Sequence, residues 1–155
     1  ALRFLFDNVS APQTRKMLLL QNASFLPLFR EAMKSRGQIG DSKIDAMTIS
    51  DAGSPATVDS TFDAVGKQPM LAAENAMSFL SSGGNAETLM NAARRLIFLK
   101  GKDAHDYKFS TAALEDYYKI SPEVRNRFMA ASMFSLKGTS APDNNLIERI
   151  RAALS

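Results

Sequence analysis

The sequence has no cysteine among its 155 residues. Disulfide bonds, thiolate zinc sites, iron–sulfur clusters and a cysteine nucleophile are therefore excluded. The absence does not decide the compartment, because proteins of many compartments can do without cysteine.

Long hydrophobic runs are missing as well. Strongly apolar runs are short, such as Met17–Leu20, whereas a membrane-spanning helix needs about 20 apolar residues. We therefore expect no membrane span, and the hydrophobic content of 45% is ordinary for a soluble globular protein. Residues 1–6 look like part of a buried element, so we expect the chain to be a piece of a longer protein.

The chain has no strong excess of either charge. It carries 19 Lys and Arg against 16 Asp and Glu, a net charge of +3 that is spread along the sequence. No segment has the basic density of a nucleic-acid tail or a polybasic membrane anchor. We therefore do not expect nucleic acid as a partner. The sequence cannot show whether its arginine pairs converge on one surface.

Catalytic motifs are also missing. The sequence has no Gly-rich phosphate loop, no Gly-x-Ser-x-Gly elbow and no His-Glu-x-x-His. His105 is its only histidine, and zinc normally needs three or four protein ligands. We expect no cofactor and no metal, and we favour a function other than catalysis.

The patterns that are present predict helices. Apolar residues recur at intervals of three and four between capping residues, prolines in first turns and terminal glycines. No segment alternates for long enough to predict a strand. We expect an all-α fold of six or seven helices in a compact bundle. Helical patterns occur at 10–21, 24–36, 57–65, 69–80, 85–101, 103–119, 121–136 and 143–154; the pattern at 57–65 is short, and the start of the one at 103–119 is open.

Residues 37–55 form the least regular stretch. They are rich in Gly, Asp and Ser, so we predict a long irregular connection within a single helical domain over residues 1–155. Ile44, Met47 and Ile49 are candidates for anchoring this connection to the core.

The segment 128–136 is apolar or small on every side. A helix of this kind lies in the middle of a bundle. We therefore predict that the helix from Pro122 to Leu136 is central and that Phe128 and Phe134 fill gaps between its neighbours.

Two helices resemble each other. Asn85 and Ser121 are candidate caps 36 residues apart, which is within the range of helical-hairpin repeats. The two patterns are out of register by one residue, and shared capping rules alone can produce such a likeness. A short α-solenoid of helical hairpins remains a second version of the fold.

The stretch 101–109, GKDAHDYKF, is the candidate polar site. In one interpretation Asp103 caps a helix that runs to Lys119, and Asp106 supports its first turn while needing a partner of its own. In another, the helix begins at Ser110 and residues 102–109 form a loop.

The same stretch also has a catalytic interpretation. His105 could move a proton, with Asp103 or Asp106 orienting its ring and Tyr107 as a second donor. We favour the structural interpretation, because aspartate at a helix start is a common way to satisfy free amide groups.

Taken together, the sequence favours a helical protein-interaction or scaffold module. Its partner would be another protein or the remainder of a longer chain. The alternative is an enzyme or ligand-binding domain with a polar site around His105.

Overall fold

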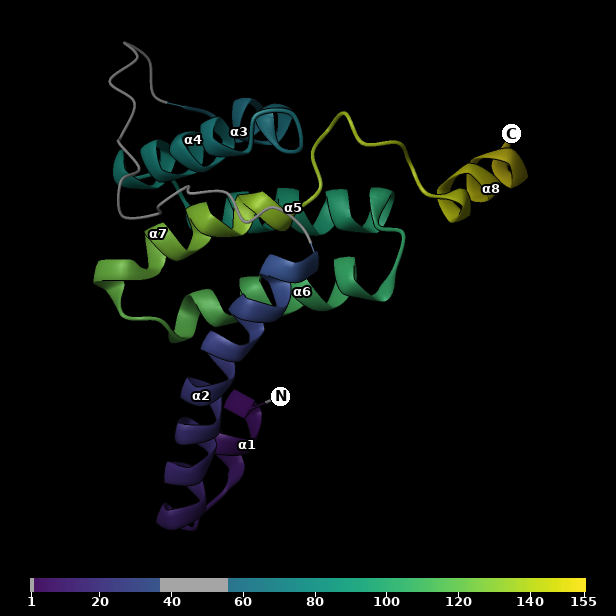
Figure 1. Cartoon of the computed structure of the whole chain (residues 1–155). Coiled ribbons are helices and arrows are strands. Elements are labelled where there is room, and N and C mark those ends of the chain that lie inside the picture. Colours follow the sequence, from purple (N-terminus) through teal and green to yellow (C-terminus); the bar gives the residue numbers. More distant parts are fainter. Residues whose placement is uncertain (1, 37–55) are drawn as a thin grey trace. The chain divides into compact units, whose positions relative to one another are not determined.

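The computed structural model describes residues 2–36 and 56–155 (Figure 1). Within these residues it contains eight α-helices and no strand. The all-α prediction is confirmed, and the helices number one more than the largest number expected. The predicted connection 37–55 and its three anchoring residues lie outside the described residues.

Contacts divide the chain into two compact units, residues 1–41 and 42–155. We call them the hairpin unit and the bundle unit. The single domain predicted over residues 1–155 stays a prediction.

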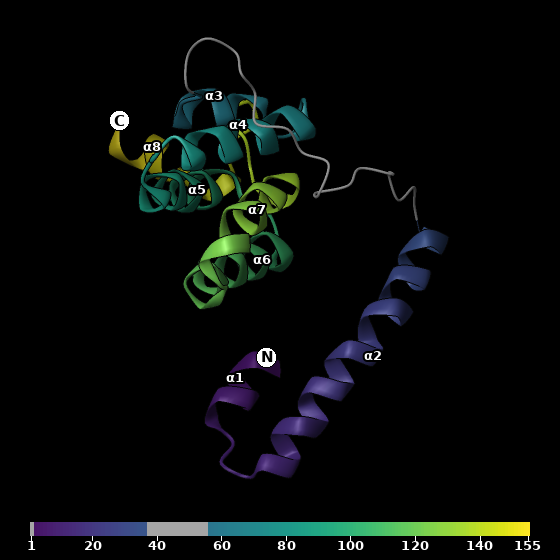
Figure 2. The same ribbon diagram turned by 90° about the vertical axis from the view of Figure 1, so that its left-hand side faces the viewer.

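The hairpin unit consists of α1 (Leu2–Asn8) and α2 (Pro12–Arg36). In Figure 2, α1 lies beside the beginning of α2. The guanidinium of Arg15 stacks over the ring of Phe6, 4.4 Å from its centroid. No side chain of residues 2–35 is buried. Phe4 and Leu5 are exposed. The prediction that residues 1–6 belong to a buried element of a longer protein stays a prediction.

Helix α2 is continuous over 25 residues, where the sequence predicted two helices at 10–21 and 24–36. Pro27 lies inside it and has no N–H to donate to the carbonyl of Ala23. Proline nevertheless has a φ angle close to that of a helix, so one lost hydrogen bond does not end α2. The hydroxyl of Ser24, predicted to start the second helix, instead donates to the carbonyl of Gln21 at 2.9 Å.

The bundle unit contains the remaining six α-helices. They are α3 (Val58–Ala64), α4 (Pro69–Ser81), α5 (Ala86–Lys100), α6 (Ala104–Asp116), α7 (Pro122–Ser132) and α8 (Asn145–Leu154). Short 3-10 turns follow α6 at Tyr117–Lys119 and α7 at Met133–Ser135.

Most of these helices begin where capping rules predict. The side chain of Thr57 accepts a hydrogen bond from the amide of Ser60, and that of Asn85 accepts one from the amide of Glu87. Ser121 makes no such side-chain bond, so Pro122 alone marks the start of α7. Helix α8 is capped by Asn144 and not by Asp143, with which we expected it to begin.

The core of the bundle unit forms around α4, which packs against both α3 and α7. Ala72, Ala73 and Ala76 of α4 have no exposed surface, and their small side chains allow the neighbouring helices to approach closely. Large buried side chains complete the core: Phe62, Leu89, Met90, Met129 and Met133.

Helix α7 is less enclosed than predicted. Phe128 is only partly buried and Phe134 is 43% exposed, whereas Met129 and Met133 are buried. The assignment of the two phenylalanines to the core is therefore wrong. The 3-10 turn at Met133–Ser135 changes the spacing of side chains from 3.6 to about 3 residues per turn, so a helical pattern continued to Leu136 misplaces Phe134.

The segment after α7 joins several helix ends. The amide of Thr139 donates to the carbonyl of Phe62 at 3.1 Å, at the end of α3. The amide of Asn144 donates to the carbonyl of Leu99 at 2.8 Å, and its side-chain amide donates to the carbonyl of Phe98 at 2.9 Å. Asn144 therefore satisfies free carbonyls at the end of α5 while its side-chain oxygen caps α8.

Candidate functional site

The candidate polar site lies at the beginning of α6. The carboxylate of Asp103 accepts hydrogen bonds from the amide of His105 at 2.7 Å and from the amide of Asp106 at 3.1 Å. Asp103 is thus the N-cap of a helix that continues, through its 3-10 turn, to Lys119. The first structural interpretation is confirmed, and a helix beginning at Ser110 is wrong.

Asp106 has partners on two sides. One carboxylate oxygen accepts the amide of Lys102 at 2.9 Å, and the other lies 2.8 Å from the ammonium group of Lys137. The side chain of Asp106 is only 15% exposed. Burial raises the pKa of this carboxyl, but the hydrogen bond and charge of Lys137 and the backbone amides outweigh it, so the pKa lies below its usual value.

His105 and Tyr107 point to different surroundings. The imidazole is 98% exposed, and its Nδ1 lies 3.7 Å from Asp103, too far for a hydrogen bond. The hydroxyl of Tyr107 donates to the carbonyl of Gly101 at 3.1 Å, at the end of α5. The four predicted residues therefore share one helix start, but they do not converge around a common point.

A surface cavity does lie next to Tyr107. Its volume is about 300 Å³, and it lies between α5 and α6. Apolar and polar side chains both line it: Arg94, Ile97, Phe98, Tyr107, Ser110, Thr111, Leu114 and Glu115. Tyr107 also lines a second hollow, of about 440 Å³, together with Lys102 and Leu146. His105 lines neither of them.

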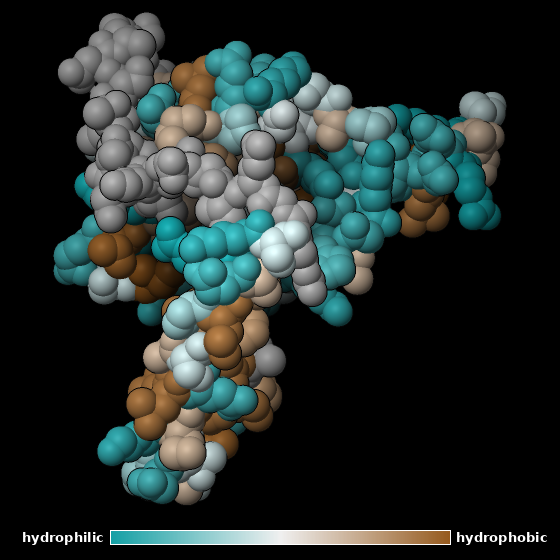
Figure 3. All heavy atoms as spheres, viewed as in Figure 1, coloured by the Kyte–Doolittle hydropathy of each residue, from teal (hydrophilic) through white to brown (hydrophobic). Residues whose placement is uncertain are grey.

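The hairpin unit carries a different kind of surface. The thirteen residues Met17–Phe29 contain no charged side chain, and we call them the apolar segment of α2. Apart from Leu18, their large hydrophobic side chains are all exposed: Met17, Leu19, Leu20, Phe25, Leu26, Leu28 and Phe29. Figure 3 shows hydrophobic residues along the surface of this unit, the lower part of the view. The rings of Phe25 and Phe29 stack with centroids 5.5 Å apart.

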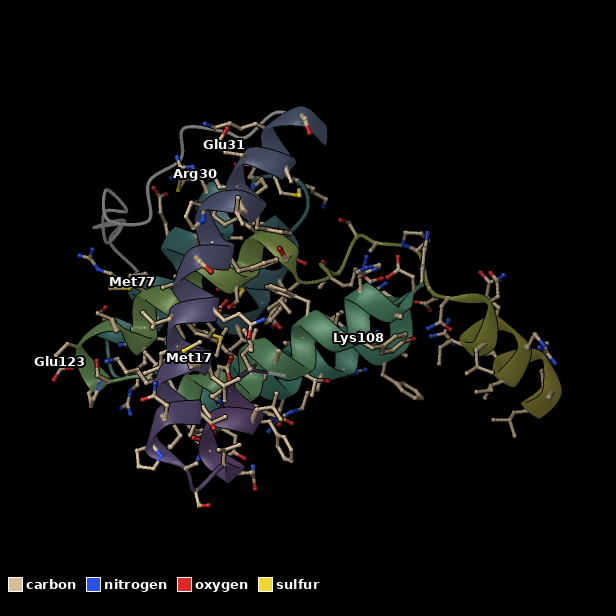
Figure 4. All side chains as sticks on the ribbon, turned by 60° about the horizontal axis from the view of Figure 1, so that its bottom comes forward. Met17, Arg30, Glu31, Met77, Lys108 and Glu123 are labelled. Carbon is tan, nitrogen blue, oxygen red and sulfur yellow. The ribbon has the colours of Figure 1, made fainter. Side chains whose placement is uncertain are left out.

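Basic residues stand at both ends of the apolar segment. Arg15 and Lys16 precede it, and Arg30 follows it directly. Met17 and Arg30 mark the two ends of the segment in Figure 4. Lys34 pairs with Glu31 at 2.6 Å, so this acidic residue is already engaged by a neighbour on its own helix.

Sequence reasoning missed this surface. The patterns at 10–21 and 24–36 predicted ordinary helices of a compact bundle, with their apolar residues in its core. Met17 and Met33 are exposed instead. The signal that could have revealed the surface is the lack of any charge from Met17 to Phe29, which removes the solvated face of a typical surface helix.

Comparisons with protein-family models, characterised proteins and solved structures found no match for this chain. Across residues 2–36 and 56–155, no helix combines the length and the hydropathy needed to cross a bilayer. The same residues contain no group of three or more carboxylate and imidazole side chains placed to hold a metal ion.

Proposed function

We propose that the chain is a helical protein-interaction module whose hairpin unit docks on a protein partner or on the remainder of a longer chain. The observation that supports this proposal is the exposed apolar segment of α2. Large contiguous apolar surfaces are uncommon on isolated soluble domains and are typical of interaction sites. Seven large hydrophobic side chains of one segment remain exposed here.

The energetics favour burial of this segment. Burying a leucine or phenylalanine side chain contributes about 1.5–3 kcal/mol, so a few of these residues in a groove give a substantial association energy before the costs of ordering. An α-helix that places its apolar residues in a groove is a common mode of protein recognition.

Capture from an extract of the native source tests the proposal. The full chain serves as bait in three forms: unchanged, with Phe25→Glu and Phe29→Glu, and with Gln21→Glu and Ser24→Glu. The two double variants add the same charge to exposed positions of the same helix. We expect the phenylalanine variant to lose a partner that the control variant retains, while circular dichroism shows the same helicity for both. Equal capture by both variants would contradict the proposal.

A second candidate is the alternative predicted from the sequence, an enzyme or ligand-binding domain with a polar site around His105, Asp103, Asp106 and Tyr107. The cavity next to Tyr107 offers a second location for such a role. The cavity of about 300 Å³ supports it, because apolar and aromatic side chains line it together with the charged Arg94 and Glu115. Turnover or saturable binding of a small molecule, lost in Thr111→Arg and kept in His105→Ala, would support a site in this cavity, because Thr111 lines this cavity and not the second hollow. Loss in His105→Ala would place it at the helix start.

A further inference from the structure

We infer that the partner of the hairpin unit is a protein with an apolar groove and acidic side chains at both ends of that groove. The inference rests on the proposed function and specifies the chemistry of its partner. Its basis is the distribution of charge around the apolar segment of α2. Residues 1–36 contain six basic and two acidic side chains, so this part of the chain has a net charge of +4.

The basic residues define the length of the partner surface. Lys16 and Arg30 are fourteen positions apart on one continuous helix. At 1.5 Å per residue they are separated by about 20 Å along the helix axis. An apolar groove of this length with carboxylates at its two ends matches the uncharged apolar segment and the basic residues Lys16 and Arg30 that flank it.

A second copy of the chain is a poor partner for the apolar segment, because its charges do not complement those of the first copy. In a parallel pair of α2 helices, Lys16 meets Lys16 and Arg30 meets Arg30. In an antiparallel pair, Lys16 meets Arg30. Both arrangements bring like charges together, which is unfavourable at an interface.

A lipid surface is also a poor partner for the apolar segment, because the apolar residues lie on several sides of α2. A helix that lies in a membrane interface has one apolar and one polar face. At 100° per residue, Leu18, Phe25 and Phe29 face one side of α2, whereas Met17, Leu20 and Leu28 face other sides. A membrane surface would leave the second group in water, but a protein groove can cover more than one side of the helix.

Two designed peptides serve as probes. Both form helical hairpins with the same leucine-lined groove, about 20 Å long, between their two helices. They differ only in having Glu pairs or Lys pairs at the two ends of that groove. Binding to the full-length chain is measured by fluorescence anisotropy at low and high salt. We expect the Glu-flanked peptide to bind roughly three- to tenfold more tightly at low salt. This preference should decrease at high salt because exposed charges are screened.

Charge reversal in the protein provides the control. Lys16→Glu with Arg30→Glu should reverse the preference, whereas Lys108→Glu with Lys119→Glu, at exposed positions of the bundle unit, should leave it unchanged. Vesicles of neutral and anionic lipid are titrated in parallel, and light scattering measures the mass of the chain.

Four results would overturn the inference: absence of peptide binding, equal binding of both peptides, stronger binding to anionic vesicles than to the Glu-flanked peptide, and a stable dimer of the chain. None of them decides the proposed function, which fails only if the Phe25 and Phe29 variant captures the same partners as its control. The two failures are therefore distinguishable.

Discussion

Asp106 is the side chain that joins the beginning of α6 to the segment after α7. Its partner Lys137 is 31 positions away in the sequence, and the side chains of both are largely shielded from solvent. An ion pair in such a place stabilises only while the carboxylate is charged, because a neutral carboxyl loses the attraction and keeps the cost of burial.

Asp106→Asn should therefore lower the free energy of unfolding by about 1–2 kcal/mol at neutral pH. The folded pKa of Asp106 is depressed, so its stabilising contribution is present above the pKa of the unfolded state and is lost as pH falls through the folded pKa. The difference between wild type and variant should shrink below about pH 4. Urea denaturation at several pH values measures it. Glu115→Gln, at an exposed position of the same helix, is the control for lost charge. A difference that does not depend on pH would contradict this assignment.

Substitutions of Asp103 and His105 should have very different effects on stability, although the two residues are only two positions apart. Asp103→Ala removes the acceptor of two backbone amides and should cost about 0.5–2 kcal/mol. His105→Ala removes an exposed ring and should change stability by less than about 0.5 kcal/mol. Thermal or urea unfolding of the two single variants gives both values. A larger cost for His105→Ala would mean that the imidazole has a structural contact in solution.

Residue 138 must be glycine because two backbone segments approach each other closely at this position. A Cβ atom on this residue would lie 2.2 Å from the carbonyl oxygen of Val65 and 2.9 Å from that of Phe62. Backbone atoms at a helix end cannot move aside cheaply, so Gly138→Ala should destabilise the bundle unit by about 1–3 kcal/mol. The exposed Ser140→Ala, in the same segment, should be nearly neutral. A melting temperature of Gly138→Ala equal to that of wild type would show that the two segments separate easily.

At the scale of whole elements, α7 shows which of its faces holds the bundle together. Met129 has no exposed surface and belongs to the core, whereas Phe134 is partly in solvent. Met129→Ala should cost about 2–5 kcal/mol, and Phe134→Ala should cost clearly less although it removes a larger side chain. Equilibrium denaturation of the two variants decides the order. A larger cost for Phe134→Ala than for Met129→Ala would contradict this expectation and would support the buried position that the sequence predicted for Phe134.

Helix starts could be predicted from the sequence because capping depends on neighbouring residues. Asn85 and Asp103 each satisfy amides two or three positions ahead, so the pattern and its cause are both local. Local sequence rules failed at two other places. They predicted a break in α2, which continues through Pro27, and they placed Phe134 in the core, because both features depend on longer segments of the chain.

The candidate sites were predictable only in part. The role of Asp103 followed from its position, but the partner of Asp106 did not, because a lysine 31 positions away is selected by the packing of α6 and α7. The apolar segment of α2 was visible as a pattern, yet its exposure was not. Hydrophobic residues predict burial, whereas the two helices of the hairpin unit do not by themselves provide it.

At the scale of the whole molecule, the two units differ in how their helices are stabilised. The bundle unit has a contiguous core that includes Phe62, Leu89 and Met90, whereas residues 2–35 contain no buried side chain. Helices without tertiary burial depend on local hydrogen bonds and are marginal in water.

Hydrogen exchange should therefore separate the two units. Amides of α4 and α5 should exchange through global unfolding and be protected by roughly a thousandfold or more, whereas those of α2 should open locally with protection below about a hundredfold. Mass spectrometry of peptides covering residues 12–36 and 69–100 measures both. Binding of the proposed partner should raise protection most within residues 17–29, because burial of the apolar segment then opposes local opening. If α2 is already as protected as α4 in the isolated chain, its apolar segment is covered without a partner, and the interaction proposal loses its principal support.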